Sequence, residues 1–236
     1  MRAVTRAVTR PNIRAAVAAG GGPTLQQALA ALLGDGQTLA YYQKAVGVTG
    51  TANVSAWANQ IGIAGPLVRL GATGPVLQAD GTLLFSGANY MEVQCVMAQP
   101  YTIYFVGKHI TYTGGAIMDA GTVVRGMIEQ YLNTPELSLY ANGGRACTNA
   151  GFALNTYGIL TAVFAGAASS LRVNETAAVA GNPGIGPPTG ITLGGRSGSS
   201  SGTNIQVRDV IVRSGSDAAG TQTAIRAALK AIHGTP

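Results

Sequence analysis

The sequence predicts an all-β protein folded as a sandwich of two antiparallel sheets, and three observations carry this prediction. Short apolar runs recur along the chain, and 34 glycines and 10 prolines punctuate it, as expected where many strands are joined by turns. Hydrophobic residues make up 47% of the chain and charged residues 10%, which allows a sizeable core. A length of 236 residues suits one large β domain.

A basic segment opens the chain. No acidic residue precedes Asp35, whereas four arginines lie in the first fourteen residues: Arg2, Arg6, Arg10 and Arg14. With the Ala/Gly stretch that follows, residues 1–36 are expected to form an arm that docks onto a neighbouring protein. The conformation of the arm stays open, because the arginine spacing suits one side of a helix but Pro11 would break that helix.

A short helix is expected to join this arm to the body. Thr24 is a suitable N-cap, and an apolar series runs from Leu25 to Leu32. Gly34 is the expected stop. The arm with its helix is therefore assigned to residues 1–36 and the sandwich domain to residues 37–236.

Eleven strands are predicted in the body. They are Leu39–Gln43, Ala52–Asn59, Gly81–Phe85, Glu92–Met97, Tyr101–Val106, Ala116–Asp119, Leu137–Tyr140, Ile159–Phe164, Ser170–Val173, Gly190–Leu193 and Asn204–Val212. The run at 101–106 is apolar on both faces, which is typical of a strand near the centre of a sandwich. The Gly/Ser stretch at 194–203 predicts a flexible loop, and Gly87, Gly166 and Gly194 are expected at turns that need a positive φ.

The chain is expected to close with a helix that starts at Asp217 or Thr221 and ends at His233. Its apolar residues recur at helical spacing: Ala224, Ile225, Ala228, Leu229 and Ile232. This is the one short C-terminal helix of the predicted fold.

Large aromatic residues are the expected anchors of the core. They are Trp57, Phe85, Phe105 and Phe164. Cys95 and Cys147 have no CxxC or CxxH neighbours and are expected to behave as small buried apolar residues. Whether the two cysteines pair is left open.

Six segments in a fixed order carry a resemblance to a known family. They are a tryptophan segment (54–62), a proline-led stretch into a Phe-x-Gly turn (74–90), a central strand (100–106), a hairpin (160–175), a Gly-Ile-Thr-Leu-Gly-Gly segment (190–195) and a strand leading into the last helix (209–215). Together, over residues 39–234, they resemble the concanavalin A-like (laminin-G-like) jelly-roll domains of bacteriophage structural proteins. The chain has Phe-Ser-Gly where the family often has Phe-Asp-Gly, which weakens any carboxylate site at that turn.

The resemblance implies a virion protein. We expect an arm-anchored surface module of the tail, baseplate or fibre that contacts host-surface glycan, with capsid decoration as the alternative. Head and tail locations stay open. The implied partners are other virion proteins bound through the arm, host polysaccharide, and further copies of the chain in a homo-oligomer. Candidate glycan contacts are Trp57, Tyr90, Tyr112 and Asn142, although Trp57 is favoured as a core residue.

No catalytic constellation is expected, so the chain is predicted not to be an enzyme. Glycoside hydrolysis needs two carboxylates held close together, and the sequence has no Glu-x-Asp-x-Glu alternation. The nine acidic residues are scattered: Asp35, Asp80, Glu92, Asp119, Glu129, Glu136, Glu175, Asp209 and Asp217. A glycan-depolymerising enzyme is the less favoured alternative.

No metal site or cofactor is predicted. His109 and His233 lack the spacing of metal ligands. Calcium, held by Asp119 with Asn142 or Asn149, is the one alternative kept.

Nucleic acid and membrane are not expected partners. Beyond the four arginines of the arm, eleven basic residues face nine acidic ones, which leaves no clustered phosphate-binding surface. No run of 18 apolar residues occurs, so no membrane span is predicted.

Overall fold

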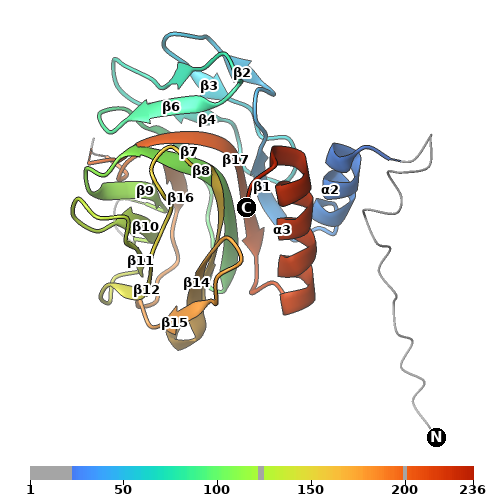
Figure 1. The fold of residues 1–236 in the computed structure, drawn as a ribbon, viewed down its shortest axis with the longest axis vertical. Coiled ribbons are helices and arrows are strands. Elements are labelled where there is room, and N and C mark those ends of the chain that lie inside the picture. The colour runs from blue at the N-terminus through green and yellow to red at the C-terminus, as the bar shows by residue number, and fades with distance from the viewer. Residues whose placement is uncertain (1–22, 122–124, 199–200) are drawn as a thin grey trace, which may run out of the picture.

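The computed structural model describes residues 23–121, 125–198 and 201–236. In these residues the chain forms two β-sheets packed face to face, with two helices on the outer side of one sheet (Figure 1). All pairs of named strands are antiparallel. The predicted all-β sandwich of jelly-roll type is confirmed.

The first sheet has eight strands around a long central pair. In spatial order they are β15 (Val179–Gly181), β14 (Ser169–Val173), β13 (Gly158–Phe164), β8 (Tyr101–Thr111), β17 (Asn204–Ser214), β6 (Leu83–Ser86) and β5 (Val76–Leu77). The eighth strand, β1 (Thr38–Tyr42), pairs with the second half of β17, beyond the part that pairs with β6. A 3-10 turn at Gly166–Ala168 joins β13 and β14.

The second sheet has nine strands. In spatial order they are β12 (Ala146–Asn149), β11 (Leu137–Tyr140), β10 (Met127–Gln130), β9 (Gly115–Asp119), β16 (Gly190–Leu193), β7 (Met91–Gln94), β4 (Leu67–Arg69), β3 (Ala56–Trp57) and β2 (Val48–Thr49). The sequence did not predict β2, β4, β10 or β12. Strands β10 and β12 position the candidate site described below.

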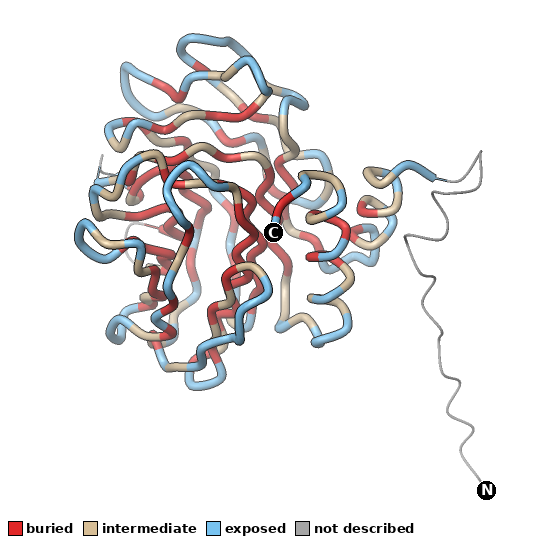
Figure 2. The backbone as a smooth tube through the Cα atoms, in the orientation of Figure 1, coloured by how far each residue is buried: buried red, intermediate tan, exposed pale blue. Residues whose placement is uncertain are grey.

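The main core fills the space between the two sheets, where buried backbone dominates (Figure 2). The four expected anchors are fully buried there: Trp57, Phe85, Phe105 and Phe164. Trp57 Nε1 donates to the carbonyl of Gln43 at 2.9 Å, which satisfies its polar atom inside the fold. Trp57 therefore has no exposed surface on which a sugar could stack. Cys95 and Cys147 are both buried and both free.

The two helices share a second core with the outer face of the eight-stranded sheet. They are α2 (Leu25–Leu33) and α3 (Ala219–His233). Thr24 and Gln27 form a capping box at the start of α2, and Gly34 is its C-cap, as the sequence indicated. Leu29 of α2 and Leu229 of α3 are buried in one cluster with residues of the sheet. The helix assigned to the arm thus packs on the body, so the boundary drawn at residue 36 crosses a shared core.

Arg213 on β17 ties both helices to the sheet. Its side chain is 1% exposed, and it binds Asp35, which follows α2, and Asp217, which precedes α3, at 2.7 and 2.8 Å. The Arg213 guanidinium lowers the pKa of Asp35 below its usual value.

The arm arginines, Arg2, Arg6, Arg10 and Arg14, lie outside the described residues. Among the helices of the described ranges, none has the length and apolar character needed to cross a bilayer. The three glycines expected at turns do have positive φ: 82° at Gly87, 58° at Gly166 and 84° at Gly194.

Candidate functional site

The outer face of the nine-stranded sheet carries a row of polar residues at matching positions of adjacent strands. Side chains alternate between the two faces of a strand, and Met91 and Leu193 belong to the core. Their neighbours Glu92 and Thr192, which pair with each other, therefore lie on the outer face. Thr192 also pairs with Asp119, so the register brings two carboxylates that are distant in sequence onto one face.

The segment after β16 folds back over this row. Ser197 Oγ donates to Glu92 Oε2 at 2.8 Å, and its backbone N–H donates to Asp119 Oδ2 at 3.2 Å. Thr192 Oγ1 donates to the same oxygen of Glu92 at 3.2 Å. The buried Ser197 thus ties the described part of the Gly/Ser segment, predicted as a flexible loop, to the sheet.

Arg125 pairs with Asp119 at the end of β9. Asp119 is fully buried, and Arg125 Nη1 donates to its Oδ2. The backbone N–H of Arg125 donates to Asn142 Oδ1 at 3.1 Å. The carboxylate proposed from sequence as a calcium ligand is therefore matched by a guanidinium.

The other expected calcium ligand, Asn149, is occupied by the backbone. Its Oδ1 accepts from Ala150 N at 2.8 Å, and its Nδ2 donates to the Leu171 carbonyl at 3.3 Å. Within the described residues, no group of three or more His, Cys, Asp or Glu is placed to hold a metal ion. Calcium binding stays a prediction.

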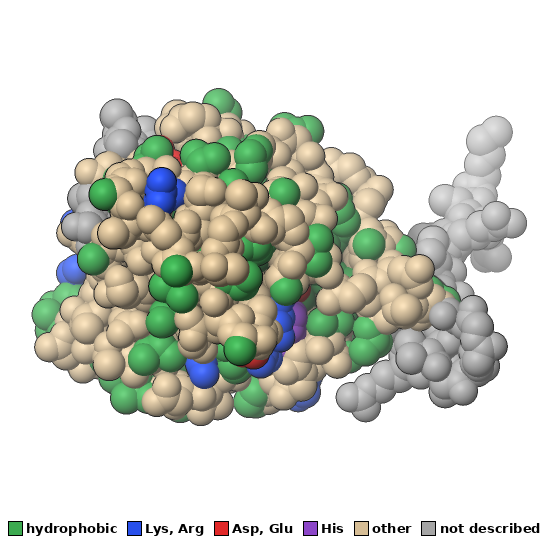
Figure 3. All heavy atoms as spheres, turned by 90° about the horizontal axis from the view of Figure 1, so that it is seen from above, with side chains coloured by type: hydrophobic (Ala, Val, Ile, Leu, Met, Phe, Trp, Pro, Cys, Tyr) green, Lys and Arg blue, Asp and Glu red, His purple; other side chains and the backbone are tan. Residues whose placement is uncertain are grey.

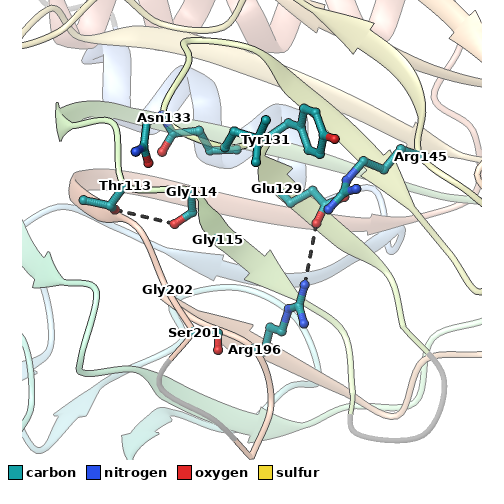
Figure 4. Close-up of a pocket in the computed structure, with 12 residues that line it drawn as sticks. Thr113, Gly114, Gly115, Glu129, Tyr131, Asn133, Arg145, Arg196, Ser201 and Gly202 are labelled. Atoms are coloured by element: carbon teal, nitrogen blue, oxygen red, sulfur yellow. Dashed lines mark hydrogen bonds and ion pairs between the residues drawn. The ribbon is translucent and has the colours of Figure 1, made fainter.

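A second buried carboxylate, Glu129 on β10, lies between two arginines (Figure 4). Arg145 Nε donates to Glu129 Oε1 at 2.5 Å, and Arg196 Nη2 lies 3.9 Å from Oε2. The Arg145 guanidinium also covers the ring of Tyr131, with its Cζ 4.2 Å from the ring centroid. Strand β10 supplies Glu129, while Tyr131 directly follows β10, Arg145 directly precedes β12 and Arg196 lies after β16.

Two hollows of about 450 Å³ each lie against this ion-paired group. They share Glu129, Arg145 and Arg196; the first reaches Tyr131 at the β10–β11 turn, and the second reaches Arg125 and Tyr140. We call the two hollows together the arginine groove. Each has a volume in the range of small-ligand sites, about 300–1,000 Å³.

The floor of the first hollow is fixed by a short hydrogen-bonded chain. Gln130, which lines the hollow, accepts from Thr203 Oγ1 at 2.8 Å and donates to the Thr134 carbonyl at 2.7 Å. His109 Nδ1 lies 3.5 Å from Thr203 Oγ1. Burial lowers the pKa of His109 to about 4, so the imidazole is neutral at ordinary pH.

The candidate glycan contacts from sequence are not gathered in one place. Asn142 is exposed and touches the arginine groove through Arg125. Tyr112 is half-buried, and its hydroxyl donates to the Phe152 carbonyl at 2.6 Å. Tyr90 is half-buried in the connection between β6 and β7, and Trp57 lies in the core.

Sequence reasoning missed the arginines of the groove. A signal was present, because Gly-Gly-Arg occurs twice, at 143–145 and at 194–196. Each copy places an arginine directly after a flexible pair of glycines. Their convergence on Glu129 depends on strand order, which no local pattern reveals.

No protein-family model matches the sequence, and no curated protein matches it either. Solved structures do resemble the fold. Domain 4 of AbnA, a GH43 extracellular arabinanase from Geobacillus stearothermophilus, in complex with arabinotriose, has a TM-score of 0.62 at 12% identity. That likeness covers 80% of this chain and 98% of the other.

A Trypanosoma rangeli sialidase in complex with sialic acid has a TM-score of 0.58 at 12% identity. The likeness covers 84% of this chain and 34% of the sialidase, so this chain spans about a third of that protein. At these identities the two likenesses show a shared β-sandwich fold.

Proposed function

We propose that this chain is a non-catalytic surface module of a bacteriophage particle and that it contacts host glycan through the arginine groove. The virion assignment rests on the family resemblance of the sequence. The glycan assignment rests on the site.

The observation that carries the glycan proposal is the arrangement of Arg145, Tyr131 and Glu129. A carbohydrate ligand combines apolar C–H faces with a rim of hydroxyl groups, so its site needs aromatic surface and fixed polar groups together. Tyr131 and Tyr140 supply aromatic surface, and the arginines supply planar donor groups. The Glu129 ion pair holds Arg145 in a defined orientation.

The same ion pairs support a binding role without catalysis. A glycoside hydrolase uses one carboxyl group as a proton donor and a second as a nucleophile or base. Glu129, which lines both hollows, and the nearby Asp119 are each matched by a guanidinium, and Glu92 is held by Ser197 and Thr192. Each of these three carboxylates thus has a partner.

The solved structures add support of a general kind. The arabinanase domain was solved with arabinotriose and the sialidase with sialic acid. Both structures are carbohydrate complexes of chains that contain this fold, although fold alone does not determine function.

The glycan proposal is tested by binding to an array of bacterial surface polysaccharides. We expect binding by the unaltered protein and at least about tenfold weaker binding by Tyr131→Ala, since loss of one well-packed aromatic contact changes affinity by about that factor. Tyr157→Ala is the matched control, because Tyr157 also lies under an arginine, Arg208, but on the eight-stranded sheet side. Equal losses in both variants would contradict the proposal.

The virion proposal is tested by location and by the arm. Labelled antibody or particle reconstruction is expected to find the chain on the tail, baseplate or fibre. Deleting residues 2–22 is expected to abolish incorporation into particles. Normal incorporation of the shortened chain would refute docking through the arm, and a head location without glycan binding would favour capsid decoration.

A further inference from the structure

The arginine groove presents more guanidinium groups than carboxylates. Arg125, Arg145 and Arg196 face two carboxylates, those of Asp119 and Glu129. The three guanidinium groups therefore exceed the two carboxylates by one positive charge, with Glu129 shared between Arg145 and Arg196. Of the acidic residues on this sheet face, Glu129 lines both hollows, Asp119 is buried under Arg125, and Glu92 accepts from Thr192 and Ser197.

Burial separates the two kinds of charge. The side chains of Arg125, Arg145 and Arg196 are 27%, 47% and 39% exposed, whereas those of Asp119 and Glu129 are 0% and 3% exposed. The carboxylates thus lie beneath the guanidinium groups. A ligand that enters the groove meets positive charge first, although the paired charges nearly cancel.

Arg196 is the arginine whose donors are left over. Its closest carboxylate oxygen, Glu129 Oε2, lies at 3.9 Å, which is too long for a hydrogen bond. Its Nε is buried and has no hydrogen-bond partner among the described residues. The Nε has almost no accessible surface, but the Arg196 side chain as a whole is 39% exposed, so a ligand in the hollow reaches this guanidinium from its open side.

Arg145, the other arginine that pairs with Glu129, is held in place by two contacts. Its Nε is bound by Glu129 and its plane lies against Tyr131, as the close-up shows (Figure 4). Arg145 and Arg196 share Glu129, so the two guanidinium groups converge on the boundary between the hollows. Planar guanidinium groups match planar carboxylates, because two N–H groups can donate to the two oxygens in parallel.

We propose that the arginine groove selects acidic glycans, with the carboxylate of a uronic or sialic acid residue bound by Arg196 and the ring of the sugar packed against Tyr131 and Arg145. This inference rests on the proposed function, since it names the class of glycan that the same groove takes.

The test compares each acidic glycan with its own carboxyl-reduced form, which keeps the sugar and removes the charge. Oligogalacturonate and sialyllactose, each with its reduced counterpart, are titrated against the full chain. We expect the carboxylate forms to bind and the reduced forms to bind at least about tenfold more weakly, as for loss of a charge-assisted hydrogen bond. Equal binding of both forms overturns the inference but leaves glycan contact standing. Absence of binding by every glycan in the panel overturns both this inference and the proposed glycan contact.

Variants locate the effect. Arg196→Gln is expected to abolish the preference for the carboxylate form, and Arg196→Lys to restore part of it, because lysine keeps the charge but loses the planar fork. Arg172→Gln removes one charge from the eight-stranded sheet and is expected to change nothing. Thermal unfolding confirms that each variant is folded. An equal loss in Arg196→Gln and Arg172→Gln would assign the effect to net charge and overturn the inference.

A sulfated neutral polymer separates carboxylate recognition from general attraction. Dextran sulfate is expected to bind weakly, with an affinity that falls steeply as salt rises. If dextran sulfate binds as tightly as the carboxylate glycans, the groove recognises negative charge without regard to its geometry. That result would contradict the proposed pairing of a planar guanidinium with a planar carboxylate.

Discussion

A buried charged residue links the helices of this protein to a sheet. This residue is Arg213. It lies 1% exposed between Asp35 and Asp217 and also donates to Thr38 Oγ1 at 2.9 Å. A buried charge is tolerated only where its hydrogen bonds are complete, and here they link α2, α3 and β17. The ion pairs therefore fix where the helices dock.

Arg213→Met is expected to lower the free energy of unfolding by about 3–5 kcal/mol, because it leaves the nearly buried Asp217 without its guanidinium. Urea denaturation at pH 7 measures this change. Asp35→Asn is the control, since the Asp35 side chain is 45% exposed and its loss should cost about 1 kcal/mol or less. Equal costs for the two variants would contradict this account.

His109 gives a pH dependence with a definite sign. Burial lowers its pKa from 6.5 to about 4, so between these values the unfolded chain binds a proton that the folded chain does not. Stability from this group is full above about pH 6.5 and falls as the pH drops towards 4, by about 3 kcal/mol in all. An NMR titration of the His109 ring should show it neutral until near pH 4, and a midpoint near 6.5 would contradict the burial.

At the scale of elements, the glycine turns hold the sheets in register. Gly194 ends β16 with φ of 84°, and a Cβ at this position would lie 2.1 Å from Phe85 Cδ1 in the core. Any residue with a side chain would be strained by this positive φ and would clash with Phe85, so only glycine fits here. The turn thus aims Arg196 and Ser197 back over the sheet face.

Gly194→Ala is expected to destabilise the protein by more than about 1 kcal/mol through backbone strain and the clash with Phe85. Gly144→Ala is the matched control, because Gly144 belongs to the other Gly-Gly-Arg segment and a Cβ there meets nothing within 4 Å. Differential scanning calorimetry compares the two. A large loss of stability in Gly144→Ala as well would contradict strain and clash at Gly194 as the cause.

The sequence predicted some elements well because their signals are local. The cap at Thr24, the stripe of α3 and the turn glycines each follow from a few adjacent residues, and the structure has them in place. Strand β10 was missed, since Met127–Gln130 places Glu129 and Gln130 inside a buried strand. Polar residues at buried positions are explained only by their partners, and Arg145, the partner of Glu129, comes from the connection between β11 and β12.

The site itself could not be predicted, because its residues meet only through long-range strand pairing. Asp119, Glu129 and Glu92 are scattered in the sequence, and that scatter argued against any shared site. Antiparallel pairing brings Glu92 and Asp119 to either side of Thr192. Long-range strand order decides which residues lie together. Trp57, favoured from sequence as a core anchor and also named as a candidate glycan contact, is fully buried in the core.

At the scale of the whole molecule, the two sheets have different outer faces. The eight-stranded sheet is covered by α2 and α3, which close a second apolar core (Figures 1 and 2). The nine-stranded sheet instead carries the arginine groove on its outer face. A view from above shows a surface of mixed apolar and polar groups with few charged side chains (Figure 3). The arginine groove, by contrast, gathers Arg125, Arg145, Arg196 and Glu129 in one place.

The helix-covered face is expected to be structural. Leu229→Ala in α3 should lower the free energy of unfolding by about 2–5 kcal/mol, because Leu229 is fully buried in the second core. Glycan affinity of the folded variant should stay unchanged, as measured by titration calorimetry below its unfolding temperature. A parallel loss of glycan affinity would place binding on the helical side.

The most direct measurement is the structure of the full chain with an acidic oligosaccharide bound. We expect the sugar on the outer face of the nine-stranded sheet, with its carboxylate within hydrogen-bond distance of Arg196 and its ring beside Tyr131 and Arg145. A sugar seated on the helical side, or at a sheet edge remote from Glu129, would contradict it.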